Sequence, residues 1–270
     1  MRDIFYDKRV AITVSILLFF ILCAVFAPFL TSFDIDASDI VERLCKPSYE
    51  HWLGCDLNGA DVWTALLYGA RVSLYVGAVA VVCSMGVGVS LGLIAGFFGG
   101  WIESIIMRAV DLVMAFPGIL LALALASVLG PNVHNVILAI TLTGWTSSAR
   151  VVRAMVLSLK EREYVLACRA LGGSNFRIIT RHIFPQLTSI LFIQVTFSLS
   201  GAILVESTLS FLGLGVNSNT PTWGALINQG RTVLQDAPHL SLAPGIALFI
   251  FILCLNILGD ALRDYFDFQS

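Results

Sequence analysis

The sequence predicts an all-α, polytopic membrane protein with six transmembrane helices. Only 13% of its 270 residues are charged, whereas soluble domains carry about 25%. The mean hydropathy is +0.87, and several uncharged runs reach the ~20 residues that a helix needs to span the hydrocarbon core. These observations exclude a soluble globular fold.

The six spans follow from the uncharged runs, taken in order along the chain. The first run is longer than the core of a signal peptide, which has about 7–15 apolar residues, so we expect an uncleaved helix. The third run has 38 residues, too many for one helix, and Gly130, Pro131 and Asn132 divide it into two spans. The uncharged runs cover residues 10–33, 72–102, 112–149, 183–205 and 240–259.

Lysine and arginine residues predict the orientation, because short cytoplasmic loops retain positive charge. With the N-terminus inside, eleven of them fall on the cytoplasmic side and four fall outside. The C-terminus is then cytoplasmic as well. This layout predicts two long outer segments, 31–71 and 207–239, and one long inner segment, 150–182.

Motifs that are missing exclude several functions for this chain. No Gly-Lys pair is followed by Ser or Thr, so there is no phosphate-binding loop and the chain is not expected to hydrolyse ATP itself. The metal-site patterns His-Glu-x-x-His and Cys-x-x-Cys are missing too. A net charge of −2 lacks the basic footprint of a nucleic-acid binder. We therefore predict a chain that is not an enzyme, holds no cofactor or metal and binds no nucleic acid.

The second span contains a row of glycines at intervals of four residues: Gly88, Gly92, Gly96 and Gly100. This spacing places them on one face of a helix, where the lack of side chains lets another backbone approach closely. The row predicts a tight helix–helix contact.

The inner segment has the pattern of two helices joined by a tight turn. Residues 160–171 favour a helix, which Gly172 and Gly173 would end with a left-handed cap. Ser174 or Asn175 could then cap the next helix. The segment also carries apolar residues that a solvated loop would not expose, and they favour a docking surface. These residues are Tyr164, Val165, Ala167, Cys168 and Leu171.

Two motifs lie in this inner segment: Glu-Tyr-Val-Leu-Ala-Cys-Arg-Ala-Leu-Gly at 163–172 and Arg-His-Ile-Phe-Pro at 181–185. They resemble the Glu-Ala-Ala loop of binding-protein-dependent ABC importer permeases. The resemblance implies a short coupling helix that sits in a groove of the ATP-binding subunit and transmits its closure. Leu166 replaces the usual Glu of the family, and Cys168 replaces the second Ala. The positions that the resemblance assigns to coupling are Leu166, Ala167, Cys168, Arg169, Gly172 and Pro185.

Four more motifs are spread along the chain. They are His-Trp-Leu-Gly-Cys-Asp-Leu-Asn-Gly-Ala-Asp at 51–61, Ser-Phe-Leu-Gly-Leu-Gly-Val at 210–216, Pro-Thr-Trp-Gly at 221–224 and Leu-Gly-Asp-Ala-Leu-Arg-Asp at 258–264. Together they resemble the C subunits of the dipeptide, oligopeptide and nickel permease family over essentially the whole chain. Cys55 and Ala60 depart from the Thr and Arg that are common in that family.

This resemblance implies the fold of a type I ABC importer permease. We expect an N-terminal transmembrane helix with an extracytoplasmic segment at 1–71. A core permease domain with five transmembrane helices and the cytoplasmic coupling loop (150–182) then occupies 72–270.

The resemblance also implies a function and a set of partners. The expected function is translocation of di- or oligopeptides across a bacterial or archaeal cytoplasmic membrane by an ATP-driven importer, with nickel or a nickel chelate as the alternative cargo. The implied partners are a second homologous permease, two ATP-binding cassette subunits, an extracytoplasmic substrate-binding protein and membrane lipid. ATP and Mg²⁺ would be held by the ATP-binding subunits.

Two of the six cysteines, Cys45 and Cys55, fall in the first outer segment. An oxidising compartment permits a disulfide between them, and two free thiols are the alternative. The other four lie in spans or on the cytoplasmic side, where they behave as small apolar residues. They are Cys23, Cys83, Cys168 and Cys254.

Charged residues inside the membrane are costly and often functional. Arg108 and Asp111 are three positions apart, which favours a local ion pair. Glu206 lies at the outer end of the fifth span. It is a candidate substrate-binding residue if it faces a water-filled vestibule, and the alternative places it in the headgroup zone. No other substrate contact is predicted.

Two other classes of protein are alternatives to the importer hypothesis. An intramembrane serine protease could use Ser147 or Ser148, but it needs a nearby histidine, and His134 lies ~20 Å away along the same helix. A stand-alone channel or ion-coupled carrier fits six spans. The docking-type inner segment and the scarcity of buried charge count against it.

Overall fold

The computed structural model describes residues 8–31, 33, 39–216 and 220–267, and their regular structure is helical apart from one isolated bridge between Cys55 and Asp61. The helices are α1 (Lys8–Val25), α2 (Ala27–Leu30), α3 (Val62–Phe98), α4 (Gly100–Met114), α5 (Gly118–Leu129), α6 (Val133–Leu159), α7 (Glu163–Ala170), α8 (Asn175–Ile178), α9 (Phe184–Phe211), α10 (Trp223–Arg231) and α11 (His239–Asp267). A short 3-10 helix at Ile40–Glu42 and a π-helical turn at Ile179–Ile183 complete the regular structure.

Four helical stretches of the described residues are long and apolar enough to cross a membrane: Lys8–Val25, Val62–Phe98, Asn175–Phe211 and His239–Phe266. The bent pair of α4 and α5 makes a fifth if it is counted as one span. With 27 residues, α6 has the length of a span, but it is not among these stretches, and its second half carries Arg150 and Arg153. Five of the six predicted spans thus have a counterpart that is long and apolar enough, namely α1, α3, the α4–α5 pair, α9 and α11, and α6 stands where the fourth span is predicted.

The predicted third span, residues 112–129, is not a continuous helix. It breaks between Met114 and Gly118, where α4 and α5 meet at an angle of 84°. Pro117 explains the break, because proline donates no backbone hydrogen bond and pushes the preceding residue out of the helical region. This part of the chain forms a bent pair rather than a straight crossing.

Helix α3 also differs from the expected second span at both ends. It begins at Val62, where Asp61 caps it by accepting a hydrogen bond from the backbone N–H of Thr64 at 2.8 Å. The domain boundary expected between residues 71 and 72 therefore falls inside a continuous helix. At the other end, Gly99 and Gly100 have φ values of +68° and +58°, a conformation that suits glycine and turns the chain into α4.

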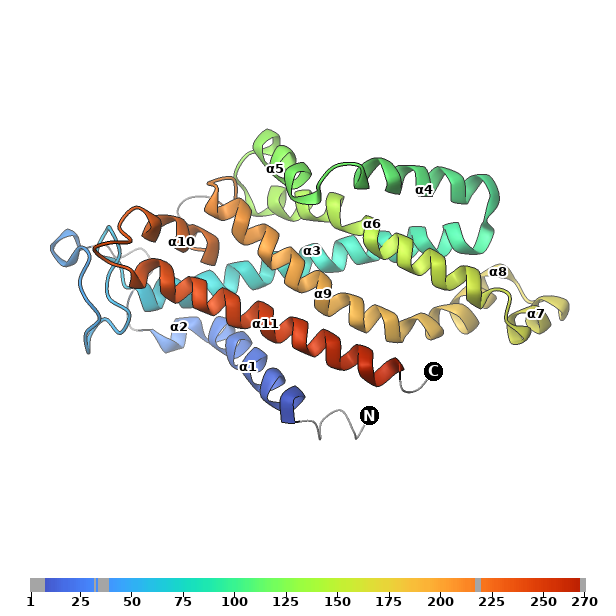
Figure 1. Cartoon of the computed structure of the whole chain (residues 1–270), viewed down its shortest axis with the longest axis horizontal. Helices are drawn as coiled ribbons and strands as arrows, with labels where there is room; N and C mark the ends of the chain where they lie inside the picture. Colours follow the sequence, from blue (N-terminus) through green and yellow to red (C-terminus); the bar gives the residue numbers. More distant parts are fainter. Residues whose placement is uncertain (1–7, 32, 34–38, 217–219, 268–270) are drawn as a thin grey trace.

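The helices form an elongated bundle in which α3 and α6 lie along one another, and α11 packs against α1, α9 and α10 (Figure 1). Three aromatic rings join the half of this bundle that carries α10. Phe20, Trp223 and Phe251 meet edge to face with centroids 5.6–5.9 Å apart. The indole N–H of Trp223 also donates to the carbonyl of Leu66 at 3.2 Å. The short helix α10 is thereby fixed to α1, α3 and α11.

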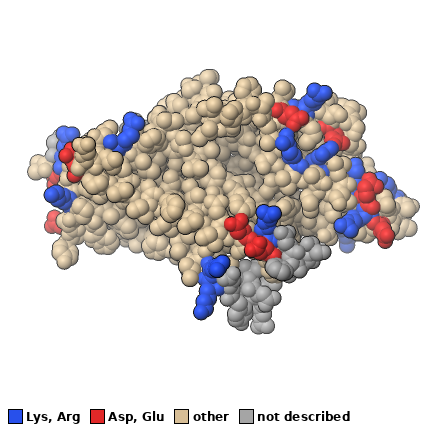
Figure 2. Space-filling view, in the orientation of Figure 1, with Lys and Arg blue, Asp and Glu red and all other residues tan. Residues whose placement is uncertain are grey.

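The two ends of the bundle differ in structure. One end carries the segment before α3 together with α10, and the opposite end carries α7 and α8 (Figure 1). The first turn of α1 and the last turn of α11 both point towards the end of the bundle that carries α7. Charged side chains gather at the two ends of the visible face and beside the termini, with a largely uncharged belt between them (Figure 2). This distribution suits a molecule whose middle lies in hydrocarbon.

Candidate functional site

Three glycines of α3, Gly88, Gly92 and Gly96, lie in close contact with α6. A Cβ atom at Gly92 would lie 2.7 Å from the carbonyl oxygen of Ala149 and 2.9 Å from the Cβ of Val152, both on α6. Gly96 meets Val156 in the same way, and Gly88 meets the backbone at Trp145. The two helices therefore approach too closely for a side chain to fit on α3 at these three positions.

Gly100 does not belong to this row, contrary to the sequence-based expectation. It is the first residue of α4, beyond the end of α3, and a Cβ there would meet no heavy atom within 4 Å. The row ends at Gly96 because the two consecutive glycines at 99 and 100 leave the helix before the next turn is complete.

The turn after α7 has the local geometry that its sequence predicts. Gly172 adopts φ +79°. Its N–H donates to the carbonyl of Arg169 at 3.0 Å, and the N–H of Gly173 donates to Cys168 at 2.9 Å, which together make a Schellman cap. Ser174 then caps α8 by accepting a hydrogen bond from the backbone N–H of Arg177 at 3.3 Å. The turn is thus a fixed structure rather than a loose loop.

The inner segment packs on the bundle through one side and leaves apolar residues on the other. Val165 is fully buried with Val156, Ile178 and Ile183, so it is not part of an exposed surface as the sequence suggested. The opposite side exposes large apolar side chains at the tip of the molecule. They are Tyr164 (42% exposed), Leu166 (43%), Leu171 (89%) and Phe176 (78%). Ala167 and Arg169 are exposed beside them, and Cys168 is half-buried.

A π-helical turn links this segment to the long helix α9. It spans Ile179–Ile183 and ends just before Pro185, which stands in the first turn of α9. Proline cannot donate to the preceding turn, and isolated π turns are frequent at functional positions in helices. Pro185 therefore marks the junction at which the inner segment meets a membrane helix.

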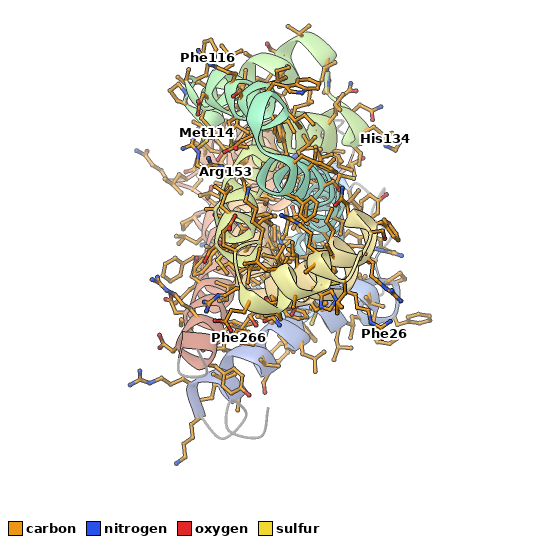
Figure 3. The ribbon with its side chains drawn as sticks, turned by 90° about the vertical axis from the view of Figure 1, so that its right-hand side faces the viewer. Phe26, Met114, Phe116, His134, Arg153 and Phe266 are labelled. Carbon is orange, nitrogen blue, oxygen red and sulfur yellow. A yellow bond between two sulfur atoms is a disulfide. The ribbon has the colours of Figure 1, made fainter. Side chains whose placement is uncertain are left out.

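Ion pairs fasten α4 to α6 near the same end of the bundle. Arg153 of α6 donates from Nε to Glu103 of α4 at 2.7 Å, and Arg150 donates to Asp111 at 2.8 Å. The expected local pair of Arg108 with Asp111 is therefore replaced by a contact between helices. Figure 3 shows this end of the molecule with Arg153 labelled. The bent pair follows α6 through these contacts.

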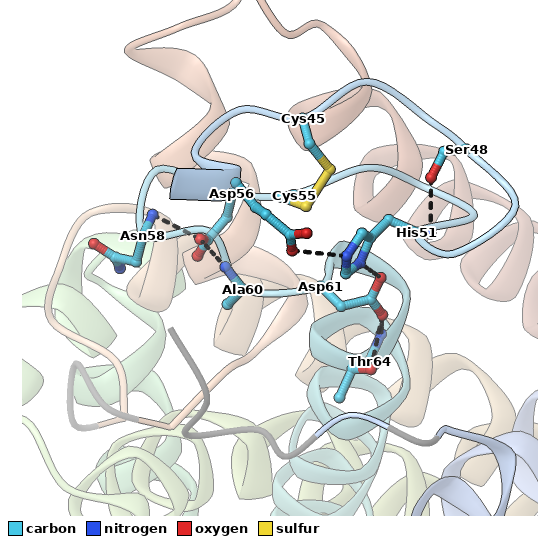
Figure 4. Close-up of a disulfide and its surroundings, with 10 residues drawn as sticks. Cys45, Ser48, His51, Cys55, Asp56, Asn58, Ala60, Asp61 and Thr64 are labelled. Atoms are coloured by element: carbon cyan, nitrogen blue, oxygen red, sulfur yellow. Dashed lines mark hydrogen bonds and ion pairs between the residues drawn. A yellow bond between two sulfur atoms is a disulfide. The ribbon is translucent and has the colours of Figure 1, made fainter. Parts of the chain in front are cut away.

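The segment before α3 is tied together by a disulfide. Cys45 and Cys55 are bonded to each other, with their Cα atoms 4.8 Å apart. The turn that follows is closed by Asp56, whose Oδ1 accepts hydrogen bonds from the N–H groups of Asn58 at 2.7 Å and Ala60 at 2.9 Å (Figure 4). The four other cysteines, Cys23, Cys83, Cys168 and Cys254, are free.

His51 is the centre of a polar network beside this disulfide (Figure 4). Its Nδ1 lies 3.0 Å from Asp61 Oδ1 and its Nε2 lies 3.0 Å from Glu42 Oε2, while Phe33 stacks on the ring at 4.6 Å. Burial disfavours the charged imidazole, but hydrogen bonds and charges from Asp61 and Glu42 outweigh it and raise the pKa of His51 above its ordinary value. The network links the outer segment to the cap of α3.

The raised pKa predicts that this segment loses stability as the pH rises. A group whose pKa is higher in the folded state stabilises it fully below the unfolded value, about 6.5, and loses that contribution above the folded value. We expect limited proteolysis within 42–60 to be faster at pH 9 than at pH 6. His51→Gln should abolish the difference, whereas the exposed His134→Gln should keep it. Equal cleavage of the wild type at both pH values would contradict the assignment.

Glu206 lies neither in a vestibule nor at headgroups in this structure. Its side chain is fully buried and accepts hydrogen bonds from Ser210 Oγ at 2.7 Å and Ser207 Oγ at 3.4 Å. The hydroxyls of Ser73 and Thr222 also face its carboxyl group. Four hydroxyl groups thus surround the carboxyl group of Glu206, the candidate for substrate binding. These contacts join α9 to α3 and α10.

A groove of about 380 Å³ opens between α3, α5, α6 and α9. Small and hydroxyl-bearing residues predominate among its polar positions, and one glutamine lies among them. The polar side chains of the lining are Ser84, Thr143, Ser147, Gln194 and Ser198, beside the glycines Gly118, Gly144 and Gly201, and the other lining residues are apolar. The groove was not predicted from the sequence, although a glutamine inside an otherwise apolar run was a signal for it.

The edge of the α4–α5 pair beside the groove is apolar and exposed. Phe116 is 62% exposed and Met114 is 45% exposed, and Figure 3 shows both at the margin of the molecule.

His134, at the start of α6, lies 13 residues before Ser147 on one helix, or ~20 Å at 1.5 Å per residue. At this separation the two side chains cannot form the hydrogen-bonded pair that a serine protease needs.

The chain is similar to membrane components of transport systems. The sequence model of one family, binding-protein-dependent transport system inner membrane component, matches residues 88–269. The dipeptide transport system permease protein DppC of Alkalihalophilus pseudofirmus is 41% identical over 97% of this chain and 86% of its own length. The glutathione transport system permease protein GsiD of Pectobacterium atrosepticum is 37% identical over 97% and 88%. A putative peptide transport system permease protein of Brucella abortus is 41% identical over 98% and 90%.

The fold is similar to that of a solved transporter. A chain of the inward facing MetNI methionine ABC transporter superposes with a TM-score of 0.59 at 18% identity, covering 74% of this chain and 95% of the other. At this identity the likeness concerns the fold alone. It confirms the predicted all-α fold of a polytopic ABC importer permease.

Proposed function

The chain belongs to the family of binding-protein-dependent transport system inner membrane components, and from this membership we propose that it moves peptides across the cytoplasmic membrane as one permease subunit of an importer. It is a multi-pass membrane protein and a permease component of the ABC importer class. The observation that carries the peptide assignment is the set of relatives above 35% identity, whose names concern dipeptide, glutathione and peptide transport.

We place ATP hydrolysis in partner subunits. The proposed assembly contains this chain, a second homologous permease, two ATP-binding cassette subunits that hold ATP and Mg²⁺, and an extracytoplasmic binding protein. The apolar tip formed by Leu166, Leu171 and Phe176 supports the docking of an ATP-binding subunit, because exposed apolar patches of this kind mark protein contacts. Within this tip Leu166, Ala167, Cys168 and Arg169 form the coupling surface, and Gly172 and Pro185 fix its frame.

The connections in the bundle supply a mechanism for transmitting closure. Helix α7 follows α6 after three residues, so a push on the coupling surface reaches α6 directly. The glycine contact makes α3 move with α6, and the Glu103–Arg153 pair draws the bent α4–α5 pair along. ATP-driven closure would then shift these helices as a body and open the groove alternately to the two sides.

We propose that the disulfide-bonded end lies outside the cytoplasm. A bond between Cys45 and Cys55 suits an oxidising compartment. The opposite end carries α7, and the described ends of α1 and α11 point the same way, which supports cytoplasmic termini.

Nickel import by the same kind of complex is the second candidate for the cargo. The structure brings Cys45, His51 and Cys55 together within 4.8 Å, but the two sulfur atoms are bonded to each other and cannot act as thiolate ligands. This trio therefore gives the nickel alternative no support. A stand-alone channel or ion-coupled carrier remains the alternative from another class.

Purification of the tagged chain in mild detergent tests the proposal. We expect a second permease and ATP-binding subunits to copurify, and the complex to hydrolyse ATP. In liposomes with the binding protein, labelled dipeptide should accumulate, and ⁶³Ni²⁺ measured in parallel should not. Nickel uptake without dipeptide uptake would reverse the cargo assignment. A lone chain without ATPase activity would favour a channel or carrier.

A further inference from the structure

Among the described residues, the groove between α3, α5, α6 and α9 contains one buried side-chain acceptor that has no hydrogen-bond partner. Oε1 of Gln194 is buried and has no partner among the described residues. Buried side-chain acceptors nearly always have a donor, so an unpaired one in a cavity indicates where a ligand supplies it. We infer that Gln194 accepts a hydrogen bond from an N–H group of the cargo as it passes, an assignment that rests on the proposed function.

Two hydroxyls of the groove are set up to accept hydrogen bonds as well. Thr143 uses its proton on the carbonyls of Ala139 and Ile140, both at 3.1 Å, and Ser84 uses its proton on Val81 at 3.2 Å. A hydroxyl that donates to its own helix presents only lone pairs to other groups. The groove thus offers acceptors to the N–H groups of a passing solute at Gln194, Thr143 and Ser84, and the Gln194 amide and the hydroxyls of Ser147 and Ser198 can donate to its oxygens.

The residues that line the groove include no Asp, Glu, His, Cys, Lys or Arg. A bare transition-metal cation prefers imidazole, thiolate or carboxylate ligands, none of which this lining supplies. Peptide N–H groups and a terminal ammonium are satisfied by neutral oxygens without any fixed charge. The cargo class that fits is a small N–H-bearing organic solute, and uncharged oxygens hold it weakly enough for release.

The groove also has room in which cargo can move. A Cβ atom added at Gly118 or Gly201 would meet no heavy atom within 4 Å, although both glycines line the groove. Gln194 and Thr143 stand well inside α9 and α6, away from the helix ends, where transporters of many folds bind their substrates. One side of the groove is left open by this chain, as expected if a second permease completes it.

Substitution of Gln194 tests the acceptor directly. The assembled complex, with its binding protein, is reconstituted in liposomes, and dipeptide uptake and ATP hydrolysis are measured separately. Gln194→Met keeps the volume and removes the acceptor, so uptake should fall about tenfold while ATP hydrolysis is kept. Gln194→Asn retains an uncharged amide oxygen and should therefore keep more of the uptake than Gln194→Met, within about threefold of wild type. Full uptake by Gln194→Met would overturn the inference.

A second variant blocks the groove without disturbing the packing. Gly201→Leu places a side chain in open space, so we expect normal complex yield and ATP hydrolysis with uptake reduced about tenfold or more. Gly86→Leu is the matched control, because it also meets no atom within 4 Å but lies outside the groove. Equal uptake by the two variants would overturn the assignment of the groove to cargo.

Cysteine labelling tests the groove independently of the cargo. In a chain whose four free cysteines are replaced by serine, Ser147→Cys and Gly201→Cys should react with a charged, membrane-impermeant thiol reagent in the assembled complex. Phe249→Cys, which is 65% exposed on α11, should stay unreactive because it faces hydrocarbon.

If the wild type imports no dipeptide, the proposed cargo is wrong. If Ser147→Cys and Gly201→Cys resist labelling, the groove itself is wrong.

Discussion

Replacing Gly92 with leucine is expected to prevent the protein from assembling. A Cβ atom at this position already lies 2.7 Å from the carbonyl oxygen of Ala149, which cannot move without bending α6. We expect a loss of about 3 kcal/mol or more, the upper end for overpacked cores, and a purified yield that falls several-fold. Yield and melting temperature of the complex in detergent measure the effect.

Gly86→Leu is the matched control for this experiment. Gly86 lies on the same helix, but a Cβ atom there has no neighbour within 4 Å, so the same change of residue adds no clash. It should leave yield and melting temperature close to wild type. Normal yield for Gly92→Leu would show that α3 and α6 are not locked together, and the rigid-body mechanism would fail with it.

Replacing Gly172 with valine is expected to uncouple ATP hydrolysis from uptake. Gly172 holds a φ of +79°, and a left-handed conformation costs other residues about 1–2 kcal/mol, more for a β-branched side chain. The Schellman cap would open and the coupling surface on α7 would lose its frame. We expect ATP hydrolysis to continue while uptake per ATP falls about tenfold, measured on the complex in liposomes.

Gly213→Val controls for the strain itself. Gly213 closes α9 with the same cap, at φ +77°, with its N–H bonded to Ser210 and the N–H of Leu214 bonded to Leu209. A Cβ atom at either Gly172 or Gly213 meets nothing within 4 Å. The uptake per ATP should therefore be unchanged in Gly213→Val. A similar loss in both variants would indicate general destabilisation rather than a coupling role.

The parts of this structure that depend on local chemistry could be predicted from the sequence. The cap at Gly172 and the start of α8 at Ser174 follow from the preferences of glycine and serine within one turn of chain. The contact of Gly88, Gly92 and Gly96 follows from helical spacing, although the sequence did not say that α6 is the partner. The Cys45–Cys55 bond was left open because two cysteines in one segment are compatible with either state.

Predictions failed where one residue overrides the pattern around it. Hydropathy made residues 112–129 a single span, but Pro117 bends the chain by 84° within that run. The spacing of four put Gly100 in the packing row, but its positive φ ends the helix. Hydropathy and spacing average over several residues and are therefore insensitive to a single break.

The surroundings of buried polar residues could not be predicted, because they come from distant parts of the chain. Glu206 meets Ser73 of α3 and Thr222 before α10, which are 133 positions before it and 16 after it. Gln194 faces α3, α5 and α6 across the groove. Only tertiary packing distinguishes a glutamate that is satisfied by hydroxyls from a glutamine that has no partner.

Helix α3 is longer than the membrane that it crosses. Its 37 residues contain no proline and extend ~55 Å, against a hydrocarbon core of ~30 Å. One unbroken rod thus joins the Asp61 cap at the disulfide-bonded end of the bundle to the end near Lys160, whose Nζ donates to the carbonyl of Gly96 at 3.0 Å. Coupling between ligands at its two ends is reciprocal by thermodynamic necessity, so if ATP binding weakens the docking of the outer partner by a given factor, docking weakens ATP binding by the same factor.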